Sequence, residues 1–282
     1  MLNNRPVRLA ALGTAVVALA AGLTTIASAD PDDDTRSADK PTIVLVHGAW
    51  SDAAGWSGVV KRLQADGYRV AAPANPLRGL SSDATYLADY LKTIHGPIIL
   101  AGHSYGGAVI TNAANGNPNV KALVYIAAFA PDKGESALAL NSKFPGSHLS
   151  DNPKAPVPTA LNAVPFTQSN GTPGIDLYLK ADKFRDVFLS NKLSKARAAE
   201  LAATQRPATA QAFGEPSGTP AWKTIPSWYL VAGDDHTIPA AAQQFMASRA
   251  NAHTTKIDAP HAVPLTDPGA VTRIVEKAAT TK

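Results

Sequence analysis

Cysteine is absent from this 282-residue chain, and charged residues make up only 17% of it. Without cysteine there is no disulfide scaffold, no thiol nucleophile and no thiolate metal site, so the fold must be stabilised by its hydrophobic core. Lys and Arg number 26, against 22 Asp and Glu. Although the pI is about 9.2, so small an excess does not indicate a nucleic-acid-binding protein.

Long hydrophobic runs are also absent, except at the N-terminus, where residues 1–29 are typical of a secretory signal peptide. Arg5 and Arg8 precede an apolar stretch, residues 9–26, and an Ala-Ser-Ala cleavage site ends at Ala29. We expect cleavage after Ala29 and a secreted or periplasmic protein without a stable membrane anchor. Retention of the segment as an anchor is the alternative.

The rest of the chain is long enough for one domain with a large core. Residues 30–41 are polar, acidic and aperiodic, which predicts a disordered lead-in. From residue 42 onward, apolar β-branched runs alternate with helical spacing, which predicts a mostly parallel sheet flanked by helices over residues 42–282. Strands are expected at Thr42–Val46, Tyr68–Ala72, Pro97–Ala101, Val120–Ala127, Ser227–Ala232 and Thr254–Ile257, and helices at Trp56–Ala65, Ser82–Ile94 (capped by Ser81 or Ser82), Ala240–Arg249 and Gly269–Ala279.

Residues 131–221 interrupt this alternation. The segment is rich in Pro, Gly, Ser and Asn up to Gly174 and then carries short helical stretches, of which Ser194–Thr204 is the clearest. Ninety residues are too many for a connecting loop, and long insertions are commonly lids or binding segments. The sequence therefore predicts an inserted cap over an active site.

A Gly-x-Ser-x-Gly pattern, Gly102 to Gly106, joins the strand Pro97–Ala101 to a helix of small residues that ends near Asn115. A strand that turns directly into a helix forces the central residue into a strained conformation and leaves no room for side chains at the flanking glycines. This nucleophile elbow exposes the hydroxyl of Ser104. The amide of Tyr105, at the start of the helix, can stabilise negative charge.

A serine nucleophile needs a base, and the base needs an orienting acid. In this architecture the acid and then the histidine follow the serine, on loops after later strands. His261 follows the last expected strand and is the candidate base. Asp235 follows the strand Ser227–Ala232 and is the candidate acid, with Asp234 and Asp132 as alternatives.

The loop after the first strand is expected to supply the second oxyanion donor, because Gly48 allows close approach and the amide of Ala49 can then face that of Tyr105. Trp50 and the cap residue Phe166 are candidates for the substrate pocket.

The remaining histidines show no catalytic context. His47 is expected to pack against or hydrogen-bond the elbow, and His103 to point away from the nucleophile. Neither His148 nor His236 lies in a catalytic pattern. No metal site and no cofactor is predicted.

Together, VLVHGAW, GHSYGG, the Asp-x-x-x-Pro at Asp235 and the late Asp-Ala-Pro-His-Ala resemble the α/β-hydrolase superfamily, particularly the small serine esterases and the methylesterase and hydroxynitrile lyase group. Carried over by position, the resemblance implies Ser104 as nucleophile, His261 as base, Asp235 as acid, and Ala49 and Tyr105 as oxyanion donors. Hydroxynitrile lyases place Lys after the catalytic histidine, where this chain has Ala262, which argues against cyanohydrin chemistry. Dehalogenases and epoxide hydrolases carry Asp at the nucleophile position, so Ser104 argues against both.

The expected function is that of an exported serine hydrolase that cleaves small-molecule carboxylic esters through an acyl-enzyme, without nucleic-acid or membrane partners. Lactone or amide hydrolysis and perhydrolysis with the same triad are alternatives within enzymes. A ligand-binding module of this fold with little turnover is the alternative from a different class.

A fluorophosphonate should label Ser104 and no other serine, because only an activated hydroxyl attacks such a reagent at a useful rate. Mass spectrometry of the labelled protein identifies the modified residue. An adduct on a different serine would show that Gly102 to Gly106 is not a nucleophile elbow.

Overall fold

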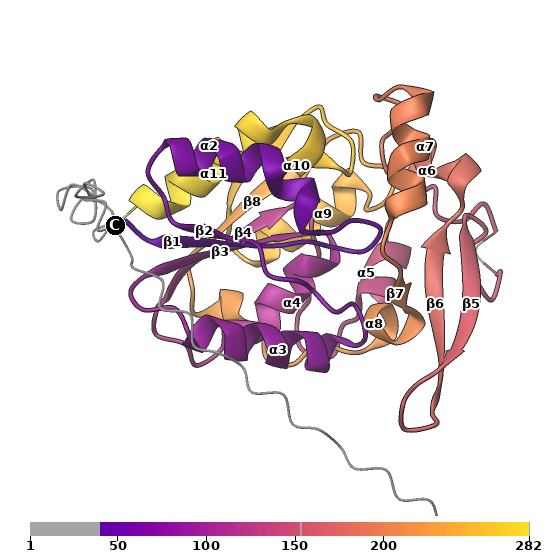
Figure 1. The fold of residues 1–282 in the computed structure, drawn as a ribbon, viewed down its shortest axis with the longest axis horizontal. Helices are drawn as coiled ribbons and strands as arrows, with labels where there is room; N and C mark the ends of the chain where they lie inside the picture. Colours follow the sequence, from indigo (N-terminus) through magenta and orange to yellow (C-terminus); the bar gives the residue numbers. More distant parts are fainter. Residues whose placement is uncertain (1–39, 153, 282) are drawn as a thin grey trace, which may run out of the picture.

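The computed structural model describes residues 40–152 and 154–281 (Figure 1). The predicted signal peptide and nearly all of the predicted lead-in lie outside these residues. A six-stranded sheet with every pair parallel forms the centre, in the order β2-β1-β3-β4-β8-β9. Its strands are β1 (Thr42–Val46), β2 (Val70–Ala71), β3 (Ile98–His103), β4 (Val120–Ile126), β8 (Ser227–Ala232) and β9 (His253–Ile257).

Both faces of this sheet are covered by helices, as the continuous apolar strands predicted (Figure 1). Side chains alternate along a strand, so Ile43 and Leu45 pack on one face, whereas Val44 and Val46 pack on the other. The first face is covered by α2 (Ser57–Ala65), α10 (Val263–Thr266) and α11 (Pro268–Thr280), and the second by α3 (Leu80–Lys92), α4 (Tyr105–Ala113) and α9 (Ala240–Arg249).

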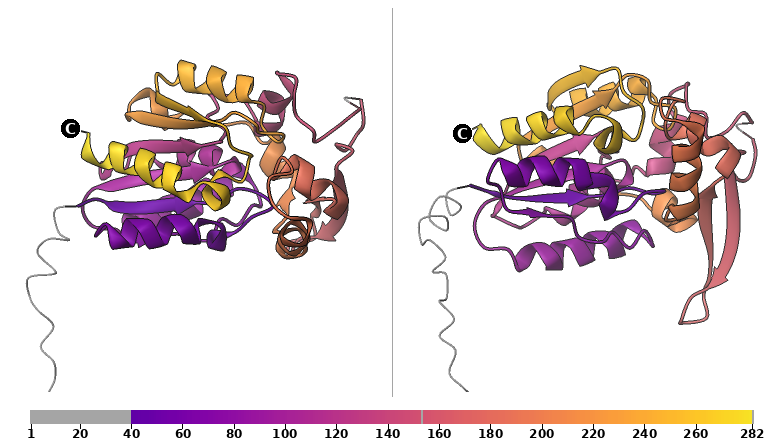
Figure 2. Two further views of the ribbon diagram at one scale, coloured as in Figure 1. Left: turned by 90° about the horizontal axis from the view of Figure 1, so that it is seen from above. Right: turned by 45° about the horizontal axis from the view of Figure 1, so that its top comes forward.

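The cap forms a separate layer at the end of the sheet where the elbow lies (Figure 2). It contains a three-stranded antiparallel sheet, β5-β6-β7, that the sequence reading did not predict. Pro165, inside β5, masked the strand pattern; proline is tolerated there because β5 is an edge strand. The segments of the cap are α5 (Ala137–Ser142), β5 (Leu161–Thr167), β6 (Pro173–Leu179), α6 (Ala181–Val187), α7 (Lys195–Thr204), β7 (Ala208–Thr209) and α8 (Ala210–Gly214). Short 3₁₀ turns lie before α2, at Ala53–Trp56, and after the cap, at Ala221–Lys223.

Most expected elements are present, and β8 and α9 have the predicted bounds.

The predicted serine cap of α3 is wrong. That helix begins at Leu80, its N-cap is Gly79, and no side chain caps it. The carboxylate of Asp83 accepts the amide of Arg78 from the preceding turn, so a buried acid replaces the serine that the pattern suggested. No helix within residues 40–152 and 154–281 is both long and apolar enough to cross a membrane.

The glycines of the elbow are required by contacts between backbones. A Cβ on Gly106 would lie 2.4 Å from the carbonyl oxygen of Val46, at the end of β1, and a Cβ on Gly102 would lie 2.6 Å from the carbonyl oxygen of Gly106. Because backbone atoms cannot move aside as a flexible side chain does, α4 can start directly against β1 only if these positions lack side chains.

Gly106→Ala should lower the free energy of unfolding by about 3 kcal/mol, since the added methyl forces the β1 and α4 backbones apart. Urea denaturation followed by circular dichroism measures the change. Gly214→Ala is the control: a Cβ there meets nothing within 4 Å, so its effect should stay within about 0.5 kcal/mol. Equal stability of the two variants would contradict the close approach.

Candidate active site

Ser104 lies between β3 and α4 in a strained backbone conformation, with φ 56° and ψ −126°. A non-glycine residue adopts such angles only where the surrounding structure enforces them. The side chain is nearly buried, at 3% exposure. The loop after β1 passes so close that a Cβ on Gly48 would lie 2.6 Å from the Cβ of Ser104 and 3.1 Å from its Oγ.

Three predicted residues from distant parts of the chain are brought together. His261 Nε2 lies 2.9 Å from Ser104 Oγ, and His261 Nδ1 lies 2.8 Å from Asp235 Oδ2. The side chains of His261 and Asp235 are fully buried. An ionised carboxylate only accepts, so Nδ1 carries the proton and Nε2 of the neutral ring is free to accept from the serine hydroxyl.

The carboxylate of Asp235 is held by further donors. The amides of Thr237 and Ile238 donate to Oδ1 at 2.7 and 2.8 Å, and Gln243 Nε2 donates to Oδ2 at 2.8 Å. The Gln243 Oε1 atom accepts the amide of Ala232 at the end of β8. Gln243 therefore fixes the acid relative to the sheet, a contact that sequence reasoning missed.

The two alternative acids have other partners. Asp132 accepts a hydrogen bond from Lys223 at 2.7 Å, which lowers the pKa of this exposed carboxyl below its usual value. Asp234 lies 3.3 Å from the ammonium of Lys192. Within residues 40–152 and 154–281, neither carboxylate contacts His261, so the geometry favours Asp235 over both.

The amides of Ala49 and Tyr105 are the two expected oxyanion donors. Tyr105 is the first residue of α4, where a backbone N–H has no partner within the helix. In the described part of the chain, neither amide donates to another protein group outside the regular helices and strands. Tyr105 follows Ser104 in the chain, and Ala49 follows Gly48, which approaches Ser104 closely, so both amides remain candidate oxyanion donors.

His103 and Phe188 enclose the imidazole of His261. His103 Nε2 donates to the backbone oxygen of His261 at 2.8 Å, and the ring centroids of these two histidines are 4.8 Å apart. Burial, followed by the charge of His261, holds the pKa of His103 well below its ordinary value. A neutral His103 therefore positions His261 without adding a positive charge that would oppose its protonation.

His47 packs against the elbow through its backbone, as expected: a Cβ on Gly106 would lie 2.9 Å from the carbonyl oxygen of His47. Its Nε2 accepts the amide of Asn75 at 3.0 Å and its Nδ1 donates to the oxygen of Gly48 at 2.9 Å. The side chain of Asn75 donates back to the oxygen of His47. Burial lowers the pKa of this imidazole, so it stays neutral and fixes the loop that carries Ala49.

An apolar cavity of about 190 Å³ opens at Ser104, between the core and the cap. Trp50, one of the two predicted pocket residues, lines it and donates from Nε1 to the oxygen of Leu177 in β6 at 2.9 Å. The other side chains that line it are Phe129, Ala137, Leu138, Asn141, Leu149, Pro156, Val157, Pro158, Leu161, Ile175, Ala210, Phe213 and Thr237.

The prediction that Phe166 lines this pocket is wrong. Its ring covers Gly174 on the neighbouring strand β6, where a Cβ would lie 2.4 Å from the ring, and it faces the guanidinium of Arg78 at 5.4 Å. The hairpin thus uses this phenylalanine to fill the gap opposite a glycine. The sequence identifies apolar residues in the cap. Whether such a side chain faces the cavity or a neighbouring strand depends on the pairing of the cap strands, which the sequence did not predict.

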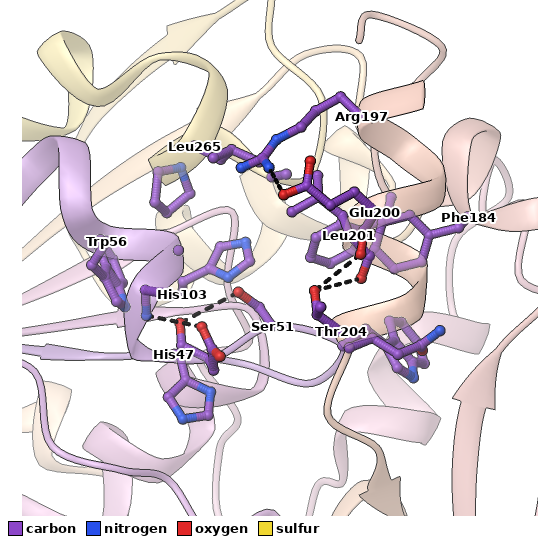
Figure 3. A pocket seen from close by; sticks show the side chains of 18 residues that line it. His47, Ser51, Trp56, His103, Phe184, Arg197, Glu200, Leu201, Thr204 and Leu265 are labelled. Carbon is purple, nitrogen blue, oxygen red and sulfur yellow. Dashed lines mark hydrogen bonds and ion pairs between the residues drawn. The ribbon is translucent and has the colours of Figure 1, made fainter. Parts of the chain in front are cut away.

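A second cavity, of about 330 Å³, is lined by side chains of the core and of the cap (Figure 3). Its walls include His47 and Trp56 of the core and, from α7 of the cap, Arg197 and Glu200, which form an ion pair. Ser104 does not line it. Trp50 lines both cavities, and the second carries more polar and charged side chains than the one that contains Ser104.

A parallel sheet with helices on both faces, a strained serine at a strand-to-helix turn, and a buried Ser-His-Asp chain of hydrogen bonds define the class of α/β-fold hydrolases. The chain belongs to the alpha/beta hydrolase family, whose sequence profile matches residues 43–274. The predicted fold and the prediction of a hydrolase enzyme are confirmed.

Relatives with assigned names are hydrolases. The alpha/beta hydrolase nvfD from Aspergillus novofumigatus is 28% identical over 264 residues, 85% of this chain and 97% of that protein. A pyrethroid hydrolase from Sphingobium wenxiniae is 31% identical over 222 residues, 72% of this chain and 74% of that protein. A carbendazim hydrolyzing esterase from Nocardioides sp. is 36% identical over 113 residues, 36% of this chain and about half (47%) of that protein's length.

Solved structures share the fold. Polyneuridine aldehyde esterase superposes with a TM-score of 0.69 at 19% identity, covering 85% of this chain and 99% of that one. An extracellular α/β-hydrolase from a Paenibacillus species gives 0.64 at 24% identity, covering 86% and 100%. Tomato methylketone synthase I gives 0.67 at 17% identity, covering 85% and 98%. The resemblance to this group of hydrolases is confirmed at the level of fold.

Asp235→Asn should reduce ester turnover by about 10³–10⁴-fold, because the imidazole loses both its orientation and the charge that stabilises its protonated form. Asp132→Asn, the matched control, should change the rate less than about twofold, since that carboxylate only pairs with Lys223. Initial rates on 4-nitrophenyl acetate, with thermal melts to show that both variants fold, make the comparison. The reverse ranking would assign the acid to Asp132.

Proposed function

We propose that the protein is a serine hydrolase that cleaves small-molecule carboxylic esters through an acyl-enzyme. The observation that carries the proposal is the buried chain of hydrogen bonds from Ser104 through His261 to Asp235, at 2.9 and 2.8 Å, beside an apolar cavity. The names of two relatives, a carbendazim hydrolyzing esterase and a pyrethroid hydrolase, support a small-molecule substrate.

In the first half-reaction, Ser104 Oγ attacks the ester carbonyl while His261 Nε2 accepts the hydroxyl proton. Asp235 stays ionised and stabilises the imidazolium. Negative charge develops on the carbonyl oxygen, where the amides of Ala49 and Tyr105 donate to it. His261 then returns its proton to the departing alkoxide, which leaves as the alcohol.

In the second half-reaction, water attacks the acyl-enzyme. His261 accepts a proton from this water and passes it to Ser104 Oγ as the acid departs. Each step requires only side chains and amides of this chain. A neutral His103 beneath His261 favours the proton transfer, because a second cation there would raise the energy of the imidazolium.

The apolar cavity indicates the substrate class. Its space of about 190 Å³ is bounded by aliphatic and aromatic side chains, with Ser104, Asn141 and Thr237 as the residues with polar side chains apart from the Trp50 indole. Such a space suits an uncharged acyl or aryl group of modest size. A charged acyl group would lose its hydration there without finding a partner.

We also propose that the protein is exported, on the strength of the signal-peptide pattern in residues 1–29. N-terminal sequencing of protein collected outside the cytoplasm should begin at Asp30. Recovery of the full-length chain in the membrane fraction would favour the anchored alternative.

A panel of 4-nitrophenyl esters of graded acyl length, with a matched lactone and amide, tests the activity and its selectivity. Wild type should hydrolyse the esters fastest, and the turnover rate of Ser104→Ala should be at least about 10³-fold lower.

Phe213→Ala enlarges the cavity and should shift the preference about tenfold toward bulky acyl groups. Phe166→Ala changes a phenylalanine outside the cavity and should leave the relative rates unchanged.

The outcomes separate the alternatives. Faster turnover of the lactone or the amide than of any ester would replace the proposed ester specificity. Tight binding of an ester without turnover would assign the fold to a ligand-binding role. Equal selectivity shifts in the two phenylalanine variants would show that the cavity at Ser104 does not hold the acyl group.

A further inference from the structure

Two histidines and one aspartate that the proposed reaction does not use converge at the border between cap and core. His148 lies in the loop between α5 and β5, and Asp186 lies in α6 of the cap. His236 follows the acid Asp235 in the loop between β8 and α9. They are separated by 38 and 50 positions along the chain, yet their potential ligand atoms all lie within 4.8 Å of one another.

The carboxylate of Asp186 contacts both imidazoles, and in each ring the contacting atom is Nδ1. His148 Nδ1 lies 2.9 Å from Oδ2, and His236 Nδ1 lies 3.0 Å from Oδ1. The two rings lie close together and are tilted, with centroids 3.9 Å apart and an interplanar angle of 31°. Both Nδ1 atoms therefore point to one place, at which Asp186 supplies the negative charge.

The backbone around the cluster is held independently of these side chains. The amide of His148 donates to the oxygen of His236 at 2.8 Å. Ser147 Oγ donates to the oxygen of Thr237 at 2.9 Å, and Thr237 Oγ1 donates to the oxygen of Val187 at 2.8 Å. These bonds join the three segments, so the ligand atoms are preorganised.

We propose that His148, Asp186 and His236 form a binding site for one divalent transition metal ion, with zinc as the best-suited metal. Two imidazole nitrogens and one carboxylate oxygen, with water in a fourth position, are a tetrahedral zinc donor set. Calcium and magnesium prefer sites made only of oxygen. Because the chain has no cysteine, no thiolate competes for the ion.

The distances suit such an ion after a small adjustment. Ligand atoms about 2.1 Å from a tetrahedral zinc lie roughly 3.4 Å from one another. The two nitrogen–oxygen pairs, at 2.9 and 3.0 Å, must each separate by only a few tenths of an ångström. His148, whose side chain is 45% exposed, has room to rotate for this adjustment.

A second carboxylate supports the site from outside. His236 Nε2 lies 3.6 Å from Asp234 Oδ1. When Nδ1 binds a metal, Nε2 carries the ring proton, and a carboxylate that accepts it fixes the ring and strengthens the ligand.

The ion would fasten the cap to the loop that carries the acid, because Asp186 belongs to α6 and His236 is adjacent to Asp235. It would touch neither Ser104 nor His261, so metal binding can be measured separately from the proposed hydrolysis. Its expected effect is a higher melting temperature of the folded chain, since the complete set of ligands exists only in the folded state.

Untagged protein, freed of metal with a chelator, is titrated with ZnCl₂ by calorimetry at pH 7.5 and melted with and without one equivalent. One ion should bind and raise the melting temperature by at least about 5 °C. Substituting CoCl₂ should give the visible absorption of a tetrahedral site. Binding should weaken at pH 5.5, where protons compete for the imidazoles.

His148→Ala and Asp186→Asn should each lower the affinity at least about tenfold and abolish the stabilisation. His95→Ala, which removes an exposed histidine elsewhere, should bind as wild type does. Melts of metal-free protein show whether each variant folds, and His148→Gln is a milder change at the same position. Absence of binding to wild type, or equal binding to His148→Ala and His95→Ala, would overturn the proposal, whatever the hydrolase assays give.

Discussion

Everything at the active site depends on three backbones that meet without side chains between them. The end of β1, the turn at Ser104 and the first turn of α4 are in direct contact because Gly48, Gly102 and Gly106 have no Cβ. This contact forces Ser104 to φ 56° and brings the Ala49 loop beside it. The strain is tolerated because β1 and β3, the strands next to the turn, are buried along their whole length, so the free energy of core packing maintains it.

Around this contact, the other residues of the site are held in place by side chains that are neutral or paired with an opposite charge. His103 and His47 are buried imidazoles that hold, respectively, the backbone of His261 and the loop after β1. Gln243 connects the carboxylate of Asp235 to the end of β8. Each of these side chains orients a group that the proposed reaction uses, and none brings an uncompensated charge into the interior.

Short-range patterns made the central layer predictable. A strand buried on both faces reads as a continuous apolar run, so β8 was placed residue for residue, and Ser104, Asp235 and His261 follow strands whose ends meet at one edge of the sheet. The cap was not predictable in the same way. The side to which a cap residue points, such as Phe166 over Gly174, depends on how β5 and β6 are paired. Tertiary packing fixes this register, and Pro165 makes the strand hard to recognise from the sequence. The Asn75 partner of His47 likewise has no local signal, since 28 positions separate the two residues.

Trp50 is tied to the cap twice: its amide donates to the oxygen of Arg206 at 2.8 Å, and its indole donates to the oxygen of Leu177 at 2.9 Å. It adopts a left-handed φ of 58°, which a bulky residue keeps only under restraint. The neighbouring residue is Ala49, the candidate oxyanion donor. The cap is therefore linked through Trp50 to the loop that carries Ala49, and displacement of the cap would break both hydrogen bonds that restrain Trp50. With its cap displaced, the protein would accept large ligands but would stabilise an oxyanion poorly. Substrate entry and the reaction would then require different conformations of the same protein.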